Sequence, residues 1–165
     1  MELSIFGRLR RGNRNVVQRR KVLIGVIFSI VAGVAMSIQG VMNTRLSENI
    51  GTMEANAFVQ CTAALLSLAA LIFYHDGSFS ALGETSKVYW FGGLFGLIIT
   101  VTVMLGIHNL SPTVSISIIL ISQLFVAALI DAFGIMGSEK VPFIWSKYVG
   151  LALMVGGVLL FKYEK

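Results

Sequence analysis

The sequence has little of what proteins use to build catalytic or metal centres. Its single cysteine, Cys61, provides neither a disulfide framework nor a cysteine metal site, and it is expected to be a small buried apolar side chain. The sequence contains no glycine-rich phosphate loop, no metal-ligand cluster, and no Ser/His/Asp set within one membrane depth. These absences argue against an enzyme, and they give no reason to expect a metal or any other cofactor.

Charge is also scarce, and it is unevenly distributed. Charged residues make up 13% of the 165 residues, whereas 56% are hydrophobic and the mean hydropathy is +0.83. The apolar residues form long uncharged runs, which predicts an all-α integral membrane protein. Seven of the thirteen basic residues lie within Arg8 to Lys21, so the net charge of +5 indicates membrane topology and no nucleic-acid partner.

Five segments are predicted to cross the bilayer as helices. No charge occurs between Lys21 and Arg45, and this stretch is too long for the apolar region of a cleaved signal peptide. Further along, polar turn residues separate the apolar runs, as at Asn109 to Pro112. The predicted organisation is a basic cytoplasmic tail at 1–21 and a membrane domain at 22–161, with spans at about 22–42, 55–74, 88–107, 112–130 and 143–161.

The segments around these spans are expected to be less regular. Residues 1–21 have too few apolar side chains to pack, which favours a mobile or interfacial tail. Residues 43–54 are interpreted as a polar connection between the first two spans. The fifth segment is short, and whether it crosses fully stays open at this point.

The basic residues favour one orientation, with the N-terminus in the cytoplasm and the C-terminus outside. In that orientation three basic residues lie outside, namely Arg45, Lys162 and Lys165. Ten lie inside: Arg8, Arg10, Arg11, Arg14, Arg19, Arg20, Lys21, Lys87, Lys140 and Lys147. Basic residues accumulate in cytoplasmic segments, so a split of ten to three favours this orientation over its reverse.

Small residues spaced along the spans predict helix contacts, because close packing drives helix association in lipid. The predicted packing positions are Gly25, Ser29, Gly33, Ser37, Gly92, Gly96 and Gly156. They fit packing within one bundle or a subunit interface, and the sequence does not decide between these.

Polar side chains within the spans are the candidates for function, because burying them in hydrocarbon is costly. No deep carboxylate or basic residue is present in the spans, so the predicted substrate pathway consists of amides, namely Gln39, Asn43, Gln60 and Gln123. The alternative is that these amides bond helices to one another. Asp131 and His108 sit at span ends and are tentative gate or ion-site residues; a capping role for Asp131 and a solvated loop role for His108 are the alternatives.

Several motifs resemble those of the YdcZ-like family within the drug/metabolite transporter (EamA-like) superfamily. They are Gln39, Asn43, Leu46, Gly51 and Ala55; the segment Trp90 to Gly96; Gln123 with Ile130 to Gly134; and Gly150-Leu151 with Gly156-Gly157-Val158. The resemblance spans nearly the whole membrane part. It is weak in the second span, around Gln60 to Ala63, and at Ser111, where a glycine is common in the family.

The resemblance implies a transporter or exporter subunit of the bacterial inner membrane that moves an unassigned small molecule. It also implies half of a ten-helix inverted-repeat transporter working by alternating access. The expected partners are the lipid bilayer and a second five-span chain, either a homologue of opposite orientation or a copy in a homodimer. The rival hypothesis is a non-transporting scaffold or regulatory subunit of another complex.

Overall fold

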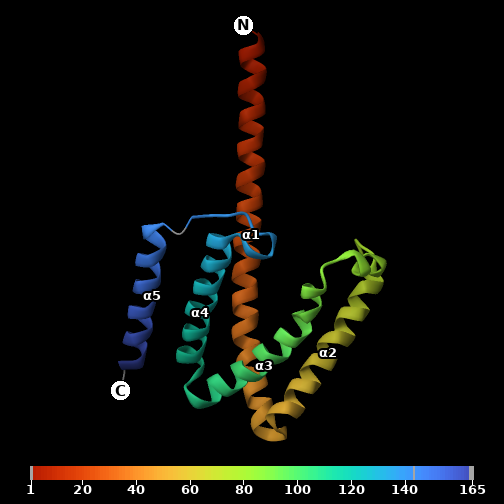
Figure 1. The fold of residues 1–165 in the computed structure, drawn as a ribbon, viewed down its shortest axis with the longest axis vertical. Helices are drawn as coiled ribbons and strands as arrows, with labels where there is room; N and C mark the ends of the chain where they lie inside the picture. The colour runs from red at the N-terminus through yellow and green to blue at the C-terminus, as the bar shows by residue number, and fades with distance from the viewer. Residues whose placement is uncertain (1, 143, 164–165) are drawn as a thin grey trace. The chain divides into compact units, whose positions relative to one another are not determined.

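The computed structural model describes residues 2–142 and 144–163, and every regular element in this described part is helical (Figure 1). The α-helices are α1 (Glu2–Ile50), α2 (Thr52–Phe73), α3 (Gly92–Asn109), α4 (Pro112–Phe133) and α5 (Trp145–Tyr163). Short 3-10 turns lie at η1 (Phe79–Glu84), η2 (Lys87–Phe91) and η3 (Ile135–Gly137). The prediction of an all-α fold is confirmed.

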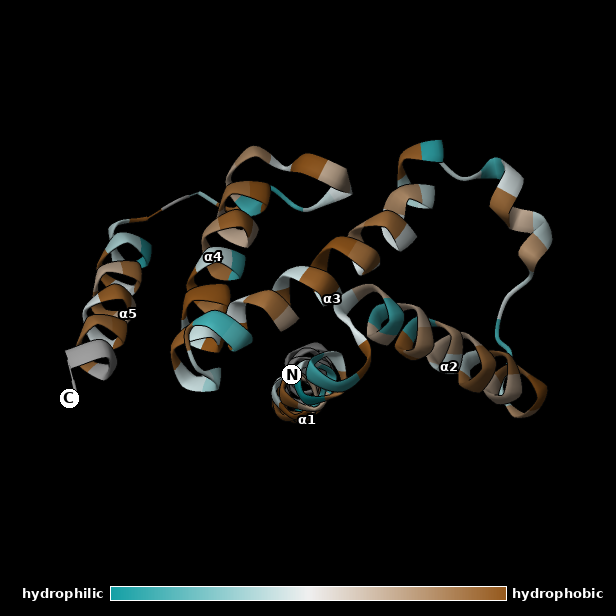
Figure 2. Ribbon diagram, turned by 90° about the horizontal axis from the view of Figure 1, so that it is seen from below, coloured by the Kyte–Doolittle hydropathy of each residue, from teal (hydrophilic) through white to brown (hydrophobic). Residues whose placement is uncertain are grey.

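Four helices in the described residues are long and apolar enough to cross a membrane. They span Gln18–Ile50, Thr52–Phe73, Lys87–Asn109 and Pro112–Phe133. The apolar part of α5, Trp145–Leu160, is shorter, although the whole helix has 19 residues and is therefore about 28 Å long, close to the thickness of the hydrocarbon core. Apolar residues surround most of these helices instead of forming one face, as Figure 2 shows.

Helix α1 differs from the prediction at both of its ends. It begins at Glu2, so the tail at 2–21 is helical; arginine, leucine and glutamine are good helix formers, and they extend a helix already nucleated in the span. It also continues to Ile50, through most of the segment expected to be a connection. The break comes at Gly51, whose φ of 98° is a conformation that side-chain-bearing residues rarely adopt.

Local sequence signals define the ends of α4. Ser111 caps its start by accepting a hydrogen bond from the Val114 amide at 3.4 Å, and Pro112 occupies the first turn. Gly134 ends the helix in the left-handed conformation at φ 65°. This end lies three residues beyond the predicted one, so Asp131 belongs to the last helical turn.

The chain divides into two compact units, Met1–Gln39 and Gly40–Lys165. In the second unit, α2 packs on α3, α3 on α4, and α4 on α5, so the helices follow one another in an open row (Figures 1 and 2). An open row buries little: Met104 is the only large side chain in the described part with less than 2% exposure.

Candidate functional site

Polar residues make up half of the buried set in the described part of the chain. The buried apolar residues are Ala55, Met104, Ile107 and Ala128, and the buried polar ones are Asn43, Thr44, Asn56 and Ser115. All but Ala128 lie near the α1–α2 turn or the α3–α4 turn, whereas large apolar side chains are exposed along every helix. A polar interior under an apolar exterior suits a protein dissolved in lipid.

Most hydroxyl groups in the helices are already satisfied by their own backbone. Thr44 donates to the Gly40 carbonyl at 2.8 Å, Thr100 to Gly96 at 2.9 Å, and Ser122 to Ile118 at 2.9 Å. Their donors are therefore not free for a solute. The amide side chains remain as the polar groups that can offer both a donor and an acceptor.

Two amides lie one turn apart on α2. Asn56 is only 4% exposed, and its Oδ1 atom has no hydrogen-bond partner. Gln60 is half-buried and faces α3 at Gly96, where its Nε2 atom would lie 3.3 Å from a Cβ added to that glycine. An unsatisfied buried acceptor is costly, so two amides are best placed to bind a polar group: Gln60, which the predicted pathway included, and Asn56, which it did not.

The other predicted pathway residues are dispersed. Asn43 is buried near the end of α1, whereas Gln123 is exposed on α4 and Gln39 is exposed within the first unit. Next to Gln123, Ser122 lines a hollow of about 320 Å³ between α4 and α5 whose other walls are apolar: Val114, Ile118, Ile121, Val155, Val158 and Leu159. Within the second unit, the structure therefore does not bring Asn43, Gln60 and Gln123 into one site.

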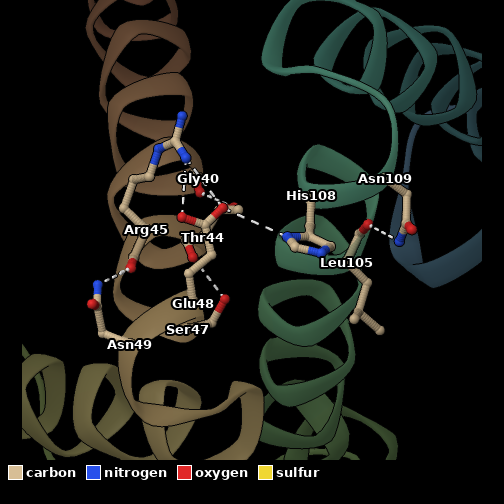
Figure 3. A network of polar contacts seen from close by, with 9 residues as sticks. All are labelled: Gly40, Thr44, Arg45, Ser47, Glu48, Asn49, Leu105, His108 and Asn109. Carbon is tan, nitrogen blue, oxygen red and sulfur yellow. Dashed lines mark hydrogen bonds and ion pairs between the residues drawn. The ribbon is translucent and has the colours of Figure 1, made fainter.

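A second polar cluster lies where α1 and α3 end (Figure 3). The Arg45 Nη1 atom donates to both carboxylate oxygens of Glu48, at 3.2 and 3.0 Å. The His108 Nδ1 atom lies 3.6 Å from the Glu48 Oε1 atom. These residues border a hollow of about 200 Å³ lined also by Val41, Thr44, Ile107, Leu110, Ser111 and Pro112.

Glu48 lies in the last turn of α1, beyond its uncharged stretch and outside the predicted span at 22–42. The hydrogen bond from Arg45 is the largest influence on its carboxyl group and, with a smaller contribution from His108, holds the pKa of Glu48 below its ordinary value of 4.5. Glu48 is therefore a carboxylate at neutral pH.

Sequence reasoning did not find Arg45 and Glu48 as site residues, because it placed them in a loop. The available signal was their spacing of three, which puts opposite charges on one helical face. His108 was identified, but its partner was not.

Asp131 lies in the last turn of α4, where a carboxylate opposes the helix dipole. Its backbone carbonyl accepts a hydrogen bond from the Val141 amide at 2.9 Å, but no ion pair to its side chain occurs among residues 18–142 and 144–160. The αL glycine and the following turn provide the cap through backbone bonds instead. Its role as a gate or ion site stays a prediction.

The small-residue positions fall into two groups. An added Cβ at Gly96 would contact Gln60, so this glycine allows α2 and α3 to approach. Gly92 and Gly156 have open space beside them, as do Gly25 and Gly33, whose carbonyls accept hydrogen bonds from Ser29 and Ser37. Cys61, expected to be buried, is exposed on the apolar surface of α2.

Among the described residues, no group of three or more His, Cys, Asp or Glu side chains could hold a metal ion. Long apolar helices with a few buried polar residues between them define a multi-pass helical membrane protein. Residues 24–160 match the family model described as "Putative inner membrane exporter, YdcZ". The chain belongs to this YdcZ family, which supports a transporter of the inner membrane. No curated protein and no solved structure matches the sequence.

Proposed function

We propose that the chain is one subunit of a dimeric secondary transporter that moves a small polar metabolite across the inner membrane by alternating access. The observation that carries this proposal is the pairing of Asn56 and Gln60 on the face of α2 that packs on α3. These amides provide hydrogen bonds without a fixed charge. Such a lining fits an uncharged polar solute best, because the amides replace the hydrogen bonds that the solute makes with water.

The open row of helices supports a dimer. Large apolar side chains are exposed along α2, α3, α4 and α5, and within the described residues of the second unit no helix packs α5 back onto α2. Inverted-repeat transporters place their substrate site where two repeats meet at the membrane midplane, so a second five-span chain would complete the site. The excess of basic residues on the predicted cytoplasmic side favours one orientation for this chain, with its N-terminus inside, and hence a homologous partner of opposite orientation.

Transport is tested in membrane vesicles from cells that make the chain, so that any partner made by those cells is present. The vesicles are loaded with an isotopically labelled extract of cell metabolites, and mass spectrometry follows which solutes leave. Vesicles from cells lacking the chain provide the baseline. At least one polar solute should leave faster only when the chain is present.

Substitution of Gln60 tests whether the solute binds to the amides of α2 on its way through the protein. Gln60→Leu should slow the movement of that solute about tenfold, which corresponds to the loss of one buried hydrogen bond. Thr62→Val is the matched control on the same helix, because Thr62 is exposed and its hydroxyl bonds only to the Phe58 carbonyl. If no solute depends on the chain, the scaffold hypothesis replaces this proposal.

A further inference from the structure

The contact between His108 and Glu48 is unlike the other polar side-chain contacts of the molecule. Within residues 18–142, every other side-chain hydrogen bond or ion pair joins residues no more than four positions apart, and so stays within one helix or turn. The pair at 3.6 Å joins the end of α1 to the end of α3. This ion pair therefore breaks if the end of α1 moves away from the end of α3.

The two helices approach closely directly below this pair. A Cβ added to Gly40 would lie 3.0 Å from the Ile107 Cδ1 atom and 3.2 Å from the Val103 Cγ1 atom. Ile107 is 5% exposed, and Thr44, one turn beyond Gly40, is 3% exposed. The pair thus lies at the rim of a tight apolar contact, beside the hollow of about 200 Å³.

The charges around His108 make its contact with Glu48 depend on protonation. Glu48 is kept ionised by Arg45, so it is a permanent acceptor on α1. Beyond the end of α3, the residues that border the hollow are Leu110, Ser111 and Pro112, which carry no charge. Protonated His108 is a cation that attracts the Glu48 carboxylate, whereas the neutral ring carries no charge and is attracted more weakly.

We propose that Glu48 and His108 form a proton-dependent latch that holds the ends of α1 and α3 together at the outer side of the membrane. Binding of one proton to the His108 ring closes the latch, and its release to water opens it. This inference rests on the proposed function, which provides the outward position of these helix ends and the need for a gate. The latch makes opening of the outer side sensitive to external pH.

The latch is tested by measuring the distance between the two helix ends in the full chain in lipid nanodiscs. Asn49 and Asn109 are exposed neighbours of the latch residues, so spin labels are attached at Asn49→Cys and Asn109→Cys in a Cys61→Ser background. Pulsed electron spin resonance is recorded at about pH 5 and about pH 8, on either side of the range in which histidine ordinarily titrates. A longer-distance population should be about threefold larger at the higher pH.

The variants separate the latch from a merely structural role. His108→Gln should remove the pH response, whereas His75→Gln, at the chain's only other histidine, should keep it. Glu48→Gln should give the longer distance at both pH values. The double variant Glu48→His with His108→Glu exchanges the partners and should restore the response, which also shows that the single variants lost the pair and not the fold.

An identical distance distribution at both pH values in the unsubstituted pair would overturn the latch, as would a response that survives His108→Gln. The measurement requires no solute. Its failure is therefore distinguishable from failure of the vesicle assay, which tests transport without reference to external pH.

Discussion

At the scale of single residues, Gly51 determines where α1 stops and α2 starts. Its backbone has φ 98° and ψ 153°, and a Cβ there would collide with the Glu54 side chain. Gly51→Ala should lower the free energy of unfolding by about 1–3 kcal/mol, the cost of forcing a side-chain-bearing residue into such a conformation. Denaturation in mixed detergent micelles measures this change.

The control for that substitution is Gly77→Ala. Gly77 also lies in a turn, but its φ is not positive and an added Cβ meets nothing within 4 Å. The alanine there should be nearly neutral. Equal destabilisation by the two alanines would show that backbone strain at Gly51 is not the cause.

The sequence predicted site residues unevenly, and the reason is the local nature of its signals. Gln60 was singled out because an amide inside an apolar run is conspicuous, and its role in a pathway stays a prediction. Glu48 was missed because polar residues after the run looked like a loop, whereas the helix continues to Ile50. The Glu48 carboxylate lies 3.6 Å from His108 because the end of α1 approaches α3, and a local sequence pattern does not predict such tertiary packing.

At the scale of elements, the contact between α2 and α3 depends on Gly96. Gly96→Leu should push Gln60 and α2 away and cost about 1–3 kcal/mol of stability, as overpacking does. Gly92→Leu is the matched control one turn earlier on α3, because nothing lies within 4 Å of an added Cβ there. Thermal unfolding in detergent should show a lower midpoint for the first variant only.

Helix positions were predictable where a turn contains strong signals. Ser111 and Pro112 mark the start of α4, and the structure uses both as cap and first turn. The ends of α1 were not predictable, because helix propensity and nucleation by the span outweigh the low hydrophobicity of residues 2–21 and the polarity of 43–50. The division of the chain at residue 21 stays a prediction.

At the scale of the whole molecule, the account depends on how many times the chain crosses the membrane. Four helices satisfy length and composition, and α5 provides 19 residues for a fifth crossing. Five crossings place the α1–α2 and α3–α4 turns on one side and the two termini on opposite sides. The positive charge near the N-terminus then orients the chain.

The most direct test is the orientation of both termini, measured with reporter fusions that are active on only one side of the membrane. The N-terminal reporter should be active only in the cytoplasm, and the C-terminal reporter should be active only outside. That result places the latch residues outside and requires an oppositely oriented partner. A C-terminal reporter active only in the cytoplasm would show that α5 does not cross, and activity on both sides would contradict the single orientation.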